Sequence, residues 1–283
     1  MTRRIWVLFA VFCVLSSVDW LLPVTDTPSS LMQQCLIYTS VGAIAVTFSR
    51  RLHRSFLLGV CGVALLGLPA ILLSLASAHL PDVMITAIFA LVPAMVVLLI
   101  AQREDNAHGL LMPAIAAFAG LLFVLPANLP ESTVARLWLM APLVAALLVA
   151  ITSVRIYGLL HEKPILPAAA TICLTNAVVL LVACIATGQA TLQLTMLRGL
   201  FSFSTVVHVA VLFTLFLLLR TMPPARLAAR FLAVPLLTVL EGFVLLRPQP
   251  TWRMALGFVL ALIGTTLLLR EKGTGEGSPL SLR

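Results

Sequence analysis

The chain has 283 residues, of which 61% are hydrophobic and only 10% are charged, and its formal net charge is +8. A water-soluble domain carries about 25% charged residues, so this composition excludes a soluble globular protein and predicts that lipid covers most of the surface. The five cysteines lie inside apolar stretches without a CxxC spacing, which argues against a metal or redox site.

Ten apolar stretches are long enough to cross the hydrocarbon core, which takes about 20 helical residues. In chain order they are 5–24, 31–49, 55–77, 83–101, 109–127, 137–154, 165–187, 197–219, 228–246 and 253–269. Arg3 and Arg4 before the first stretch resemble the start of a signal peptide. No clear cleavage site follows them, so the first stretch is interpreted as a retained helix.

The basic residues predict the orientation of these spans. With the N-terminus placed inside, all but four of the 18 Lys and Arg residues fall at the inner ends of the spans. The four outer residues are Arg136, Arg198, Arg247 and Arg253. Because loops rich in Lys and Arg stay in the cytoplasm, both termini are predicted to be cytoplasmic. Basic loops facing an anionic inner leaflet account for the net charge without a nucleic-acid partner.

Two prolines in similar contexts indicate an internal repeat. Pro93 and Pro235 each lie inside an apolar span, and each has another proline twelve residues upstream, Pro81 and Pro223. The repeats are expected at residues 1–130 and 131–283, with five spans each. Because five is odd, the second repeat enters the membrane inverted relative to the first. The predicted fold is therefore an all-α polytopic membrane protein of ten transmembrane helices in two inverted five-helix repeats.

Short motifs in both halves resemble a known family. They are Ala90-Leu-Val-Pro93, Gln102-Arg-Glu-Asp105 and Ala119-Gly-Leu-Leu122 in the first half, and Phe231-Leu-Ala-Val-Pro235, Gly257 and Ile263-Gly264 in the second. The chain resembles the ten-helix, EamA-type transporters of the drug/metabolite transporter superfamily. The resemblance implies export or exchange of small metabolites, amino acids or drugs across the bacterial inner membrane, or exchange of sugar phosphates or sugar nucleotides, as in some members. One departure is the first helix, where Ser16-Ser-Val-Asp-Trp20 is a weak match to the family segment.

Charged groups within apolar spans are costly, so they mark candidate functional residues. Glu241 in the ninth span and His208 in the eighth could bind substrate or carry a proton, and Ser204 shares a helix face with His208. Asp19 and the adjacent Trp20 lie near the outer end of the first span. The competing interpretations are a hydrogen-bonded neutral glutamate, a packing histidine and an ordinary interfacial acid.

Pro93 and Pro235 are predicted to kink their helices, because proline removes one backbone hydrogen bond and clashes with the preceding turn. The kinks could serve gating, or they could be static features of the fold.

The sequence therefore predicts a secondary active transporter that works by alternating access, with no catalytic residue, metal or cofactor, because no motif of a soluble enzyme is present. The alternative is an integral membrane enzyme or flippase acting on lipid-linked substrates. The expected partners are a small-molecule substrate and the bilayer. Protons and a second copy of the chain are partners that the sequence leaves open.

Overall fold

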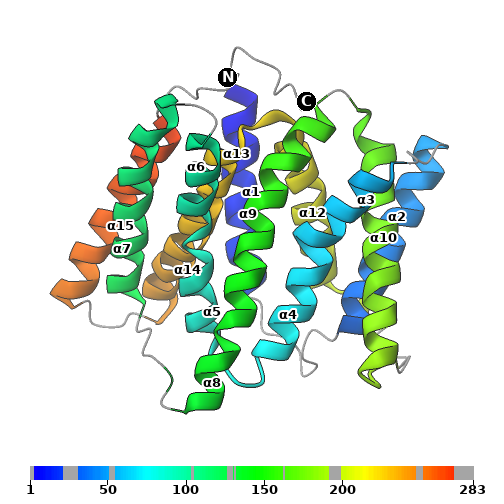
Figure 1. The fold of residues 1–283 in the computed structure, drawn as a ribbon, viewed down its shortest axis with the longest axis horizontal. Helices are drawn as coiled ribbons and strands as arrows, with labels where there is room; N and C mark the ends of the chain where they lie inside the picture. The colour runs from blue at the N-terminus through cyan, green and yellow to red at the C-terminus, as the bar shows by residue number, and fades with distance from the viewer. Residues whose placement is uncertain are drawn as a thin grey trace. The chain divides into compact units, whose positions relative to one another are not determined.

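The computed structural model describes residues 3–21, 31–50, 55–102, 105–125, 130, 132–161, 163–190, 199–246 and 251–270. Across these ranges the regular structure is helical (Figure 1). The helices are α1 Arg3–Leu21, α2 Leu31–Ser49, α3 Phe56–Gly62, the π-helical turn η1 Val63–Gly67, α4 Leu68–Ala76, α5 Asp82–Phe89, α6 Val92–Ala101, the 3-10 turn η2 Asp105–Leu110, α7 Leu111–Val124, α8 Thr133–Trp138, α9 Met140–Leu160, α10 Ile165–Ala186, α12 Phe203–Thr221, α13 Pro224–Ala228, α14 Arg230–Leu246 and α15 Trp252–Arg270.

Eight helical stretches of the described residues are long and apolar enough to cross a membrane. Each of them overlaps one of the predicted spans. Two predicted spans fall outside the eight: the first, which is helix α1, and the fifth, where the apolar helix His108–Val124 is shorter. The all-helical fold is thus confirmed for the described residues, with eight candidate membrane spans. The count of ten spans and the inverted repeats stay predictions.

Polar side chains and prolines fix several helix ends. Ser55 and Ser132 cap α3 and α8, where their hydroxyl oxygens accept hydrogen bonds from the backbone N–H groups of Leu58 and Ala135. The end of α10 is a Schellman motif, in which Gly188 takes a left-handed φ of +69° and Gln189 N–H donates to the Cys184 carbonyl at 2.8 Å.

The chain forms two compact units, and neither is continuous in sequence. Unit 1 consists of residues 1–74 and 155–221, and unit 2 consists of residues 75–154 and 222–283. Two of the three boundaries fall within α4 and α9, and the third follows the end of α12, so each unit contains helices from both predicted repeats. The predicted repeats, in contrast, are continuous halves of the sequence that meet at residue 130, and this division stays a prediction.

Unit 1 is organised around the long contact between α2 and α10, which lie side by side. Glycine permits the close approach, because a Cβ built on Gly42 would lie 2.8 Å from a methyl carbon of Leu174. The Cys35 thiol donates to the Ala177 carbonyl across the same pair at 3.2 Å. Helix α12 packs against α1 and, over a shorter stretch, against α10.

Unit 2 is organised around a second long contact, between α7 and α15 (Figure 1). A Cβ on Gly120 would overlap the backbone nitrogen of Ala261, and a Cβ on Gly264 would lie 2.6 Å from the Pro113 carbonyl oxygen. The two backbones therefore touch without intervening side chains, as in small-residue contacts between membrane helices. This contact anchors the helices against which α6, α13 and α14 pack.

Candidate functional site

Unit 2 contains two transmembrane stretches that are interrupted in the same way. Each begins with a proline in extended conformation before a short helix: Pro81 precedes α5 with φ −68° and ψ 146°, and Pro223 precedes α13 with φ −54° and ψ 142°. A second, longer helix follows after a break of one or two residues, giving α5/α6 and α13/α14. Interrupted helices at corresponding positions of two halves are the sequence pointer to a transporter binding site.

The breaks are tight turns. At the first, Leu91 N–H donates to the Ile88 carbonyl at 3.0 Å, and at the second, Ala229 N–H donates to the Arg226 carbonyl at 3.1 Å. In these bonds the N–H group donates to the carbonyl three residues earlier, as in a 3-10 turn, and not four residues earlier, as in an α-helix.

The two repeat prolines differ in their local setting. Pro93 lies in the first turn of α6, where a missing N–H is tolerated, whereas Pro235 lies inside the continuous helix α14. Both prolines thus lie inside apolar stretches as predicted, but only Pro235 lies inside a continuous helix, because the chain before Pro93 is broken at Ala90–Leu91. Gating by either proline stays a prediction.

The two interrupted stretches meet through a pair of aromatic rings. Phe89 and Phe231 have their ring centroids 5.8 Å apart at an interplanar angle of 47°. Each phenylalanine stands four residues before its repeat proline, in the shared pattern Phe-x-x-Val-Pro. Corresponding positions of the two similar sequence patterns thus contact each other within unit 2, and α6 packs against both α13 and α14.

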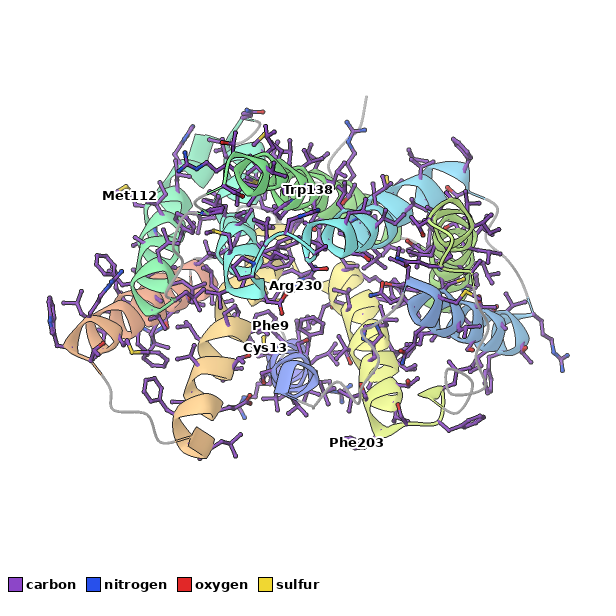
Figure 2. The ribbon with its side chains drawn as sticks, turned by 90° about the horizontal axis from the view of Figure 1, so that it is seen from below. Phe9, Cys13, Met112, Trp138, Phe203 and Arg230 are labelled. Carbon is purple, nitrogen blue, oxygen red and sulfur yellow. The ribbon has the colours of Figure 1, made fainter. Side chains whose placement is uncertain are left out.

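A cation adjoins this ring pair. The guanidinium carbon of Arg230 lies 4.7 Å from the centroid of the Phe231 ring, within cation–π range. Arg230 and Arg226 are both buried, with 7% of each side chain exposed. Arg230 is the first residue of α14, whereas Met112 of α7 points outward in Figure 2 and is 73% exposed.

Glu241 also lies in unit 2, on α14, and is partly buried. It follows Arg230 by about three helical turns, which is about 16 Å of axial rise and returns the chain to nearly the same face. The helix therefore presents a cation near its start and an acid near its end on one side, with Pro235 between them.

The other predicted side chains belong to unit 1. His208 and Ser204 lie one turn apart on α12, His208 partly buried and Ser204 exposed. Asp19 and Trp20 are in the last turn of α1, but their side chains lie outside the described residues. The functional roles of these four residues stay predictions.

Sequence reasoning missed Phe89, Arg226 and Arg230 as site residues. The positive-inside bias identifies both arginines only as cations at the inner ends of the spans, and it gives no information about their burial. The repeated Phe-x-x-Val-Pro pattern was the available signal for Phe89, because aligning the prolines also aligns the phenylalanines.

Known proteins resemble this chain in sequence and in fold. Residues 136–270 match the EamA-like transporter family. Among solved structures, a chain described only as "Crystal structure of protein" superposes with a TM-score of 0.76 at 17% identity, covering 94% of this chain and 98% of its own. At that identity the likeness shows a shared fold alone. None of the curated proteins matches this sequence.

The matched residues include the whole of α9 through α15, and with them the second interrupted stretch with Arg230, Phe231 and Pro235. The helices that are long and apolar enough to cross a membrane are consistent with that match. Residues 136–270, just under half of the chain, are therefore similar to the EamA-like transporter family.

Proposed function

We propose that this protein is a secondary active transporter that exports or exchanges small metabolites, such as amino acids or drugs, by alternating access. The observation that carries the proposal is the pair of interrupted stretches, α5/α6 and α13/α14, which occupy corresponding positions and meet at Phe89 and Phe231. Transporters built from inverted repeats bind substrate where such discontinuous helices meet.

The pairing of helices supports ten spans in two inverted repeats. Counted along the chain, α2 and α10 are the second and seventh predicted spans, and α7 and α15 are the fifth and tenth. Each long contact thus joins a span to the one five places later. A two-fold axis in the membrane plane places counterparts side by side in this way.

The bacterial inner membrane, crossed many times with both termini in the cytoplasm, is the proposed location. The distribution of Lys and Arg supports this orientation. Arg220 and Arg270 lie in the last turns of α12 and α15, at the ends that this topology places inside. A second copy of the chain remains a proposed partner.

Coupling is assigned to Glu241 and His208, with protons as the proposed driving ion. The partial burial of both side chains within apolar helices supports a role in binding or proton transfer. Ser204, one turn from His208, and the Asp19–Trp20 pair are proposed to contribute to the same function.

Uptake into inside-out membrane vesicles tests this assignment. We expect Glu241→Gln and His208→Ala to lower proton-gradient-driven uptake of a mixture of 14C-labelled amino acids or of ethidium at least tenfold, or to change its pH dependence. Asp82→Asn and His108→Ala are matched controls, because both native side chains are exposed. Wild-type rates with an unchanged pH profile in both test variants would refute the coupling role.

A further inference from the structure

Two arginines of unit 2 are buried, whereas the other described Lys and Arg side chains are not. Arg226 and Arg230 are 7% exposed, whereas the remaining Lys and Arg side chains in the described part of the chain are half-buried or exposed. The positive-inside bias requires only that a cation reach the interface, which long side chains do by snorkelling. Burial of these two guanidinium groups goes beyond what the positive-inside bias requires.

The first repeat shows that an interrupted stretch folds without these cations. Aligning Pro81 with Pro223 and Pro93 with Pro235 places Met84 opposite Arg226 and Ile88 opposite Arg230. Met84 is buried at 6% exposure, so the equivalent position packs well with an apolar side chain. The arginines are a property of the second repeat and not of the shared architecture.

The backbone between them brings the two side chains to one side of the chain. Ala229, at the break, keeps right-handed helical angles of φ −56° and ψ −17°. Residues four apart on helical backbone are neighbours, with about 5–6 Å between their Cβ atoms. Arg230 also begins the 17-residue helix α14, whose N-terminal N–H groups favour negative charge.

We propose that Arg226 and Arg230 bind the oxyanion group, a carboxylate or a phosphate, of a small ligand whose apolar part lies against Phe231 and Phe89. The proposal deepens the proposed transport function and rests on it, because it names the substrate class. Each guanidinium has five N–H donors in a planar fork that fits an oxyanion. Both arginines also take part in interactions within the protein, and five donors leave capacity for a ligand.

Thermal unfolding of the full-length protein in detergent tests the proposal. We expect sodium benzoate or inorganic phosphate to raise the unfolding midpoint by about 3 °C or more over sodium chloride of equal ionic strength, because ligands stabilise the state that binds them. Benzoate should raise the unfolding midpoint more than phosphate does, because its ring can lie against the two phenylalanines.

Three variants assign the shift to these residues. Replacing both arginines by the first-repeat residues, Arg226→Met with Arg230→Ile, should abolish the shift. Arg226→Lys with Arg230→Lys should weaken benzoate binding at least fivefold while leaving it measurable, because lysine lacks the planar fork. Arg253→Gln removes one exposed cation of the same unit and should leave the shift at its wild-type size.

A second measurement distinguishes a soluble solute from a lipid headgroup. A shift with benzoate in lipid-free detergent assigns the site to solutes, whereas a shift only on adding phosphatidylglycerol to phosphatidylcholine nanodiscs assigns it to headgroups. No shift in either medium, or an equal shift when both arginines are replaced by Met and Ile, would overturn the proposal. Because the readout is binding, a protein that binds benzoate but moves no solute would contradict the transport function alone.

Discussion

At the scale of single residues, the contact between Phe89 and Phe231 links the two halves of the chain. Both rings are half-buried and sit 5.8 Å apart, each four residues before a proline. An aromatic pair in this geometry contributes about 0.5–1.5 kcal/mol beyond the burial of its area. The contact therefore couples the two interrupted stretches energetically as well as in space.

A double-mutant cycle measures that coupling. Phe89→Leu and Phe231→Leu keep an apolar side chain, and the double variant should be less destabilised than the sum of the single variants by about 0.5–1.5 kcal/mol. The readout is the free energy of unfolding in mixed micelles. Strict additivity would mean that the rings do not interact in the folded protein, and Phe243→Leu, elsewhere on α14, serves as the uncoupled control.

Some of these residues could be recognised from the sequence alone, and others could not. Pro93 and Pro235 could be recognised because proline has a fixed local effect and the two recur in similar contexts. The burial of Arg226 and Arg230 could not be predicted, because it depends on the packing of α13 and α14 against helices such as α6, which is distant in sequence. The local sequence is equally compatible with arginines whose side chains extend to the membrane interface.

At the scale of helices, hydropathy predicted the spans because a backbone in lipid must satisfy its own hydrogen bonds. The predicted stretch 31–49 coincides with α2, and 165–187 differs from α10 by one residue. The interior breaks were not predicted. Apolar residues continue across Ala90–Leu91 and through the π-helical turn Val63–Gly67, so hydropathy has no signal there.

The α7–α15 contact gives an element-scale prediction. Gly120→Ala adds a Cβ that would overlap the backbone of Ala261, so we expect a loss of about 1–3 kcal/mol from overpacking. Gly242→Ala on α14 is the control, because nothing lies within 4 Å of its added Cβ and alanine favours the helix. Thermostability by fluorescence-detected size exclusion reports both, and an unfolding midpoint for Gly120→Ala at or above wild type would rule out the close contact.

At the scale of the whole molecule, each compact unit draws helices from both predicted repeats. Sequence order suggests halves that fold side by side, and the observed units instead join α2 with α10 and α7 with α15. Which spans pair depends on matching small residues across a long sequence separation, such as Gly120 on α7 with Gly257 and Ala261 on α15. A single sequence shows those residues but not which helix each will face.

The proposed transport function belongs to the scale of the whole molecule, because its candidate residues come from both units. A reconstitution experiment tests this function without a chosen substrate. Liposomes that contain the purified protein are incubated in a bacterial metabolite extract and recovered by filtration. Mass spectrometry of the trapped solutes should show at least one metabolite enriched fivefold or more over protein-free liposomes, and Glu241→Gln should reduce that enrichment. Identical contents in liposomes with and without folded wild-type protein would contradict the account.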